Sequence, residues 1–114
     1  MSNFDRLPEF EKEFVRLCKK YRTLDSDLAR FESVLEILPT GTGKAFTIIY
    51  SSAEVTIVKA RLACKALRDQ SLRIIYAYHD DIISFVHIEI YFKGDKENED
   101  RQRIKEYVAK VKKK

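Results

Sequence analysis

The sequence predicts a single α+β domain, with an N-terminal helical hairpin packed on a small antiparallel β-sheet meander and a C-terminal helix. Three observations support this fold class. Apolar residues recur at helical spacing in residues 8–38, alternate with a period of two in residues 55–93, and return to helical spacing in residues 97–113. At 114 residues the chain has room for one domain, so we assign all of residues 1–114 to it.

The first segment indicates two helices. In one, the apolar face repeats at steps of four, three and four residues, through Phe10, Phe14, Leu17 and Tyr21. In the other, the steps are three, four and three, through Leu28, Phe31, Leu35 and Leu38. Pro39 ends the second helix, because the residue before a proline avoids the α conformation. A short turn at Thr23–Ser26 joins the helices, so we expect an antiparallel hairpin.

Three strands are expected in residues 55–93. The first covers Val55–Cys64, the second Leu72–His79 and the third Ile82–Lys93, with a tight hairpin at Asp80-Asp81. Because the strands are consecutive and closely joined, an antiparallel meander is the natural arrangement.

The segment Thr40–Lys44 is rich in glycine and has the sequence Thr-Gly-Thr-Gly-Lys. A phosphate-binding P-loop needs four residues between its glycines, a strand before it and a helix after it. Here a helix is expected before it, and the β-like segment Phe46–Tyr50 follows. We therefore interpret Thr40–Lys44 as a connection, and Phe46–Tyr50 as either a further strand or an irregular connector.

Composition excludes several classes of protein. With 45% hydrophobic and 35% charged residues, the chain is neither disordered nor a membrane protein. No apolar run approaches a membrane span and no signal peptide is visible, so we expect a cytoplasmic protein with no membrane partner. Cys18 and Cys64 allow one disulfide, but two separate thiols are favoured in a reducing cytosol. The two histidines and two cysteines lack metal-ligand spacing, and we expect no metal and no cofactor.

The net charge of +4 is unevenly distributed along the chain. Residues 1–40 carry 7 basic and 8 acidic side chains, residues 41–93 carry 7 and 5, and residues 94–114 carry 8 and 5. The excess of positive charge in the later two-thirds suits a polyanionic or acidic partner.

Basic residues recur on one side of the predicted strands. Lys59 and Arg61 are two residues apart, so they point to the same side of their strand. Arg73 alternates with apolar neighbours in the next strand, as a residue on that side should. Apolar residues such as Ile57 and Ile75 share this side, which suggests a shallow pocket floor with a cationic rim; the alternative is a solvated sheet face.

The third strand adds a polar row, His87–Glu89–Tyr91–Lys93, again at a spacing of two. We expect Glu89 to pair with a neighbouring cation. If this row faces the same way as Lys59, Arg61 and Arg73, four cations meet an imidazole and an aromatic ring. A cluster of cations would also lower the pKa of a lysine within it.

The chain resembles the RelE/ParE toxin superfamily. The resemblance rests on the order of elements and on three short stretches: Val58-Lys59-Ala60-Arg61-Leu62, Leu72-Arg73-Ile74-Ile75-Tyr76 and Ile88-Glu89-Ile90-Tyr91-Phe92-Lys93. Members of that superfamily are toxins of type II toxin–antitoxin pairs. RelE-like members cleave messenger RNA, often in the ribosomal A site, and ParE-like members inhibit DNA gyrase.

The resemblance implies a metal-independent endoribonuclease, in which the 2′-OH of the RNA is the nucleophile. Lys59 would act as a base or an electrostatic stabiliser, and Arg61 and Arg73 would bind phosphate oxygens. Lys93 lies where RelE-like nucleases usually place an arginine. Tyr91 or His87 would stack on a base or transfer a proton.

One departure from the family concerns the proton donor. RelE-like nucleases commonly carry a tyrosine or histidine shortly after the late-strand cation, whereas here residues 94–100 are Gly-Asp-Lys-Glu-Asn-Glu-Asp. Tyr91, His87 or Lys96 would have to replace it, or the target is not RNA. The alternatives are therefore a ParE-like gyrase inhibitor or an inactive binding domain.

The resemblance also implies partners. They are messenger RNA, with or without the ribosome, and an antitoxin whose acidic amphipathic segment wraps the helical hairpin or covers the cationic face. We expect oligomers only with that antitoxin.

Overall fold

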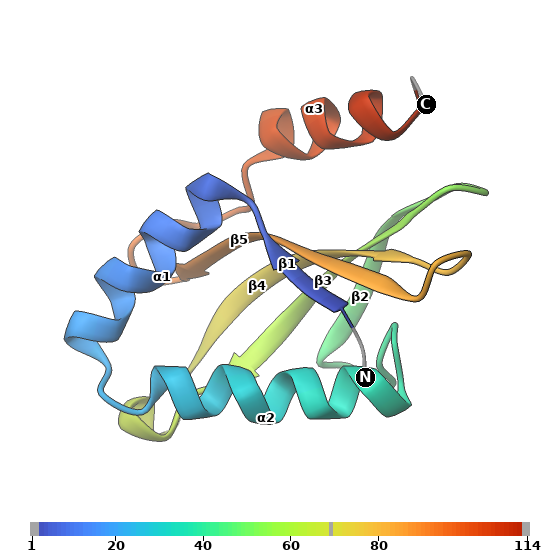
Figure 1. Ribbon diagram of the computed structural model, residues 1–114. Helices are drawn as coiled ribbons and strands as arrows, with labels where there is room; N and C mark the ends of the chain where they lie inside the picture. Colours follow the sequence, from blue (N-terminus) through green and yellow to red (C-terminus); the bar gives the residue numbers. More distant parts are fainter. Residues whose placement is uncertain (1–2, 69, 113–114) are drawn as a thin grey trace.

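A computed structural model of the chain describes residues 3–68 and 70–112. It confirms the α+β class, with three α-helices and one five-stranded sheet (Figure 1). The elements in order are β1 (Asn3–Arg6), α1 (Pro8–Lys20), α2 (Leu24–Ile37), β2 (Phe46–Ser51), β3 (Thr56–Ala63), the 3-10 turn η1 (Lys65–Leu67), β4 (Ser71–His79), β5 (Ser84–Phe92) and α3 (Arg101–Lys112).

The sheet is mixed, and the prediction of an antiparallel meander alone is wrong. Its strand order is β1-β5-β4-β3-β2. The three expected strands do pair consecutively and antiparallel, as β3, β4 and β5, and β2 continues this pattern. At the other edge β1 pairs with β5 in parallel. With four residues, β1 is too short to show a clear period of two in the sequence.

One face of the sheet is covered by α1 and α2. The helices bury the apolar positions that the sequence indicated, including Phe10, Phe14 and Leu17 of α1. They do not form the expected antiparallel hairpin: α1 lies on β5 and α2 on β3, and the two diverge from the short turn that joins them (Figure 1). Each helix therefore buries its apolar face mainly against the sheet.

The opposite face is covered by α3 alone. Beneath this helix lies a second, smaller apolar cluster that includes Ile57, Ile75, Ala77 and Ile88. The expected helical start at residue 97 is wrong: α3 begins at Arg101, and its expected end at residue 113 lies outside the described residues. Residues 93–100 form an irregular connection, which we call the strap.

A β-bulge in β5 changes which residues share a face. Ile75 of β4 pairs with Glu89, but the next residue, Tyr76, pairs with His87, so Ile88 is the additional residue. Adjacent residues of β4 point to opposite faces, and therefore so do Glu89 and His87. The predicted polar row is divided at this point.

The glycine-rich segment is a connection between α2 and β2, as expected. Gly41 and Gly43 have φ angles of 67° and 79°, which disfavour other residues. A Cβ atom at Gly41 would lie 2.1 Å from Cγ of Phe46, so the backbone at Gly41 also lies too close to the Phe46 ring to carry a side chain.

The thiols of Cys18 and Cys64 are both free.

Candidate functional site

Three of the predicted site residues lie side by side across the sheet. In the register of the strands, Arg61 of β3 is opposite Arg73 of β4, and Arg73 is opposite Tyr91 of β5. Lys59 lies two residues before Arg61 and therefore points to the same face, one row away. The structure thus places Lys59, Arg61, Arg73 and Tyr91 on the face that α3 partly covers.

A hollow of ≈ 510 Å³ opens at one end of this row. Its lining residues are Arg61, Gln70, Ser71, Arg73, Phe92, Lys93 and Gly94. Arg73 is held at the rim because its Nη1 donates hydrogen bonds to Oγ of Ser71 at 2.9 Å and to the Ser71 carbonyl at 3.3 Å. Gly94 lies so close to Phe92 that a Cβ atom would be 2.4 Å from Cε2 of that ring.

The three cations of the hollow are Arg61, Arg73 and Lys93. Among the described residues, which leave out Asp69, none of them forms an ion pair with a carboxylate. Like charges gathered in a concave site attract anions, and a guanidinium binds phosphate oxygens through two parallel N–H groups. The hollow therefore has the chemistry of a phosphate-binding site.

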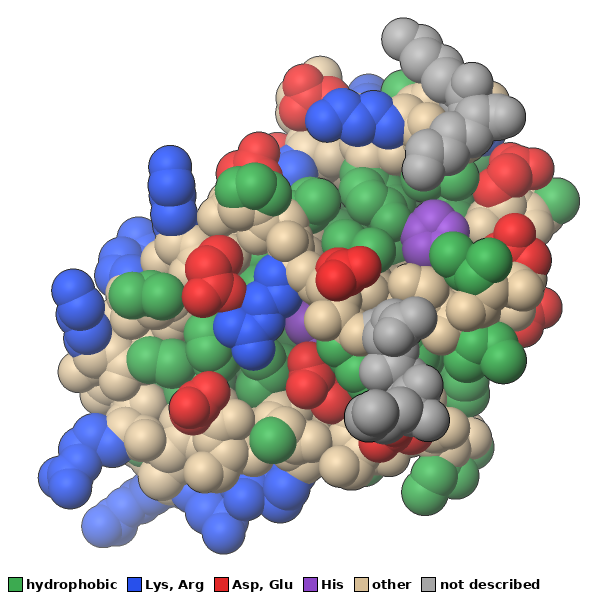
Figure 2. All heavy atoms as spheres, viewed as in Figure 1, with side chains coloured by type: hydrophobic (Ala, Val, Ile, Leu, Met, Phe, Trp, Pro, Cys, Tyr) green, Lys and Arg blue, Asp and Glu red, His purple; other side chains and the backbone are tan. Residues whose placement is uncertain are grey.

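Basic and acidic side chains outside the hollow gather on different sides of the molecule. Figure 2 shows basic side chains along the left edge of the molecule, around α1, and along its lower edge, around η1 and α2. Acidic side chains lie at the right, around the turn after β4. The exposed basic residues of α1 are Lys12, Arg16, Lys19 and Lys20. The ring of Tyr21, which follows α1, lies 6.4 Å from that of Phe92. The hollow is thus at the basic end of the molecule.

Lys59 lies near the hollow but does not line it. Its Nζ donates a hydrogen bond to Oε1 of Glu99 at 2.9 Å. This bond raises the pKa of Lys59, although burial acts in the opposite direction. The expectation that neighbouring cations lower the pKa of Lys59 is therefore wrong, because the hydrogen bond to Glu99 has the largest effect on it.

Tyr91 is buried beneath the strap, with 4% of its surface exposed. Its hydroxyl has no hydrogen-bond partner among the described residues. Burial raises the pKa of Tyr91, while the positive charge of Lys59 opposes this effect. Nζ of Lys96 lies 5.5 Å from the centre of the ring. In this arrangement the ring of Tyr91 is not accessible for stacking on an RNA base.

His87 is not part of the basic face, and this site prediction is wrong. The bulge at Ile88 turns its side chain toward α1 and α2, where none of its surface is exposed. Its Nε2 lies 2.8 Å from Oε2 of Glu32, and its ring stacks on Phe10 at 5.1 Å between centres. His87 is therefore a residue of the core.

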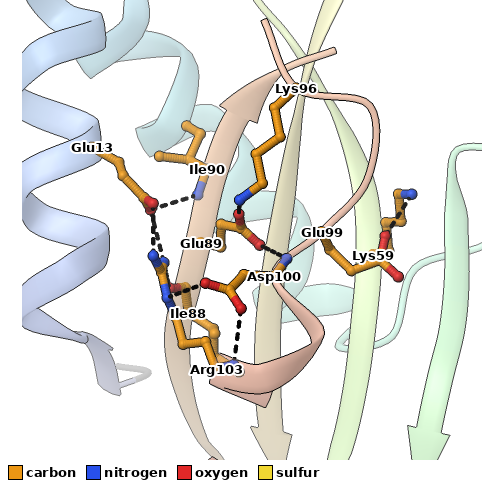
Figure 3. Close-up of polar contacts among 9 residues, drawn as sticks. All are labelled: Glu13, Lys59, Ile88, Glu89, Ile90, Lys96, Glu99, Asp100 and Arg103. Atoms are coloured by element: carbon orange, nitrogen blue, oxygen red, sulfur yellow. Dashed lines mark hydrogen bonds and ion pairs between the residues drawn. The ribbon is translucent and has the colours of Figure 1, made fainter. Parts of the chain in front are cut away.

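The strap is attached to the sheet by charged and polar contacts (Figure 3). Glu89, which is fully buried, pairs with Lys96 and accepts a hydrogen bond from the backbone N–H of Asp100 at 2.7 Å. Its expected pairing with a neighbouring cation is confirmed. Together with the pair between Lys59 and Glu99, these contacts hold both halves of the strap over β3 and β5.

The start of α3 is fastened to α1 by Arg103. This guanidinium forms two hydrogen bonds with the carboxylate of Glu13, at 3.0 and 2.9 Å, and donates another to the carbonyl of Ile88 at 2.9 Å (Figure 3). These bonds raise the pKa of Arg103. Sequence reasoning missed Glu99 and Arg103, because residues 97–113 were interpreted as one continuous helix.

A larger cavity of ≈ 780 Å³ lies between α3, the end of β4 and the start of α1. Its lining includes the carboxylates of Asp5, Glu54 and Glu106, and also His79 and Tyr107, whose Nε2 and Oη lie 2.6 Å apart. Burial, supported by the negative charge of Asp5, raises the pKa of Tyr107 to about 12. Because carboxylates outnumber cations there, this cavity is a poor site for an anion.

Comparison of the chain with models of protein families and with curated proteins gives no match. In the described part of the chain, no helix has the length and apolar character needed to cross a bilayer. Among the same residues, no group of three or more His, Cys, Asp or Glu side chains could hold a metal ion.

Proposed function

We propose that this chain is a RelE/ParE-type toxin of a toxin–antitoxin pair and acts as a metal-independent endoribonuclease on messenger RNA. The observation that carries the proposal is the hollow lined by Arg61, Arg73 and Lys93. The two arginines face each other across neighbouring strands, so their guanidinium groups can bind the same phosphate. The α+β fold, with two helices on one face of the sheet and a helix after the last strand, is compatible with this family.

The proposed reaction needs little from the protein beyond charge and position. The 2′-OH of the RNA gives its proton to a water molecule as its oxygen attacks phosphorus, and the bond from phosphorus to the 5′ oxygen breaks. The leaving 5′ oxygen takes a proton from water, so the products are a 2′,3′-cyclic phosphate and a 5′-hydroxyl. Arg61, Arg73 and Lys93 would stabilise the negative charge that increases on the phosphorane oxygens. Since Glu99 raises the pKa of Lys59, that lysine is protonated at neutral pH and would act as an electrostatic stabiliser instead of a base.

A second candidate function is inhibition of DNA gyrase by binding, as in ParE-like toxins. It is favoured by one observation, the lack of an accessible tyrosine or histidine next to the hollow. Residues 93–100 contain no tyrosine or histidine, Tyr91 is buried and His87 is on the other face of the sheet. In either function we propose an acidic antitoxin segment as the partner that neutralises the basic end of the molecule, and a cytoplasmic location.

The test replaces each arginine of the hollow. We expect Arg61→Gln and Arg73→Gln to lower RNA cleavage about 10- to 100-fold, because each removes a charged hydrogen bond worth about 1.5–3 kcal/mol. Cleavage is mapped by primer extension on cellular messenger RNA after expression, alongside growth arrest. Lys105→Gln, which removes an exposed charge on α3, is the control and should remain active.

Two outcomes would decide against cleavage. If both arginine variants remain fully toxic, the hollow is not the active site. If the wild type arrests growth without cutting RNA and inhibits supercoiling by purified gyrase, the second candidate is correct.

A further inference from the structure

The strap has an unusual composition for a segment that covers a sheet. Residues 93–100, Lys-Gly-Asp-Lys-Glu-Asn-Glu-Asp, include no apolar side chain. Its described side-chain contacts with the sheet are the Lys59–Glu99 pair, the two bonds to Glu89 and the approach of Lys96 to the ring of Tyr91. Backbone hydrogen bonds to Phe92 complete its attachment. Contacts of this kind are weakened by salt and by competing ions, whereas apolar packing is not.

Glu99 occupies a position that suits an anion. Its side chain is 9% exposed, with one carboxylate oxygen 2.9 Å from Nζ of Lys59 and the other 3.6 Å from Nε of Arg101. Lys59 is on the same face of β3 as Arg61, and residues two apart on a strand are about 7 Å from each other. This distance is close to the spacing of successive phosphates in a nucleic-acid strand. Carboxylate and phosphate oxygens accept hydrogen bonds from the same donors.

Tyr91 lies under the same part of the strap. Its buried hydroxyl has no hydrogen bond of good geometry, although the ammonium group of Lys59 is close enough to lower the pKa of Tyr91. Moving the strap aside would return this hydroxyl to solvent beside Arg73, its neighbour across the sheet. Opening would therefore satisfy a polar group that the closed strap leaves poorly satisfied.

We propose that the strap is an autoinhibitory segment, in which the Glu99 carboxylate occupies a phosphate subsite at Lys59 and is displaced when a phosphate chain fills the hollow and that subsite together. Gly94 and the exposed residues after it form one end of the strap, while Glu89 anchors its far end through the backbone of Asp100. The identification of the phosphate-bearing ligand as RNA rests on the proposed function. The displacement of Glu99 by a phosphate group does not depend on that function.

The experiment compares Glu99→Gln with Glu97→Gln. Both changes remove one negative charge from the strap, but Glu97 is exposed and contacts none of the described cations. The probe is a fluorescent RNA hexamer with 2′-O-methyl groups, which cannot be cleaved, and binding is followed by anisotropy at low salt. We expect Glu99→Gln to bind about 5- to 10-fold more tightly than the wild type, and Glu97→Gln to bind within about 2-fold of it.

Lys59→Met identifies the subsite. In the double variant Lys59→Met/Glu99→Gln, the tighter hexamer binding of Glu99→Gln should disappear, because the lysine that would bind the phosphate has been removed. If Glu99→Gln binds no more tightly than Glu97→Gln, or if the gain persists without Lys59, the proposal is overturned. Urea unfolding of each variant verifies that the affinities refer to folded protein.

A second probe separates this proposal from the proposed function. Inorganic pyrophosphate is titrated while the side-chain NMR signal of Lys59 is observed. If no variant binds the hexamer, but pyrophosphate shifts the Lys59 signal in Glu99→Gln more strongly than in the wild type, the subsite is supported and RNA is the wrong ligand. If pyrophosphate shifts the signal equally in both proteins, Glu99 does not occupy the subsite.

Discussion

The two faces belong to the same five-stranded sheet but are covered in different ways. On the face of α1 and α2, apolar and aromatic side chains of both helices and of the strands form one cluster, which includes Phe10, Leu35 and Ile90. On the face of α3, an apolar cluster covers only part of the strands, and charged residues under the strap cover the rest. The comparison shows that one face provides most of the stability, which leaves the other free to display cations.

The difference is also visible in the helices. In α1 the residues Phe10, Phe14 and Leu17 are buried, whereas Val108 is the one buried residue within α3. Burial of a large apolar side chain stabilises the fold by about 1.5–3 kcal/mol, so α3 contributes less from packing. Its attachment depends to a greater degree on Arg103 and Glu13, whose side chains are 16% and 19% exposed.

The largest expected effect tests the stability of the helical face. Phe10→Ala should lower the free energy of unfolding by about 3–5 kcal/mol, because it removes a fully buried ring that stacks on Phe14 and His87. Urea denaturation followed by circular dichroism measures the change. Val15→Ala is the control: Val15 of α1 is 47% exposed, and the variant should stay within about 0.5 kcal/mol of the wild type.

An intermediate effect tests whether the side chains of His87 and Tyr91 point to opposite faces of the sheet. His87→Ala should cost about 2–3 kcal/mol in stability, since it leaves a cavity and removes the contact with Glu32. Tyr91→Phe should change stability by less than about 1 kcal/mol, because the lost hydroxyl has no partner. Both are measured by urea unfolding, with hexamer binding as a second readout. A large loss of binding in folded His87→Ala protein would contradict the placement of His87 in the core.

The smallest effect concerns the pH dependence of the strap. Burial tends to raise the pKa of Glu99, but the hydrogen bond from Lys59 and nearby cations lower it below its ordinary value of 4.5. A lowered pKa stabilises the folded protein above pH 4.5 and the contribution is lost as pH falls through the folded value. The raised pKa of Lys59 stabilises the folded protein below pH 10.5 and is lost as pH rises beyond it.

The contribution of Glu99 to stability should therefore be greatest between these two values. Wild type and Glu99→Gln are compared by urea unfolding at several pH values. We expect a difference of up to about 1 kcal/mol near pH 7 that shrinks below pH 4.5. A difference that stays constant down to pH 3 would show that the ion pair is not its origin.

Sequence reasoning succeeded where a regular period extends over many residues. The helical spacing of Phe10, Phe14 and Leu17 and the alternation around Lys59 and Arg61 both match the structure. It failed where no period exists. The short strand β1 pairs with a strand about 80 residues away, a long-range contact that local pattern does not contain.

The same reason explains the mixed result for the site. Arg61 and Arg73 were placed on one face correctly, because alternation is unbroken in β3 and β4. His87 was misplaced because a bulge adds one residue without changing the apolar pattern around it. Glu99 gave no signal, since an acidic residue in a charged connection has many possible partners in space.

The bulge at Ile88 also has a consequence for how β5 tolerates changes of length. Losing one residue from a strand normally sends every later side chain to the opposite face. At Ile88 the loss would instead restore regular pairing, because Glu89 and His87 already sit opposite the adjacent residues Ile75 and Tyr76. A chain without Ile88 would keep its buried imidazole and its basic row on their present sides. A deletion at Ile88 should therefore change the facing of the other β5 side chains less than a deletion elsewhere in this strand.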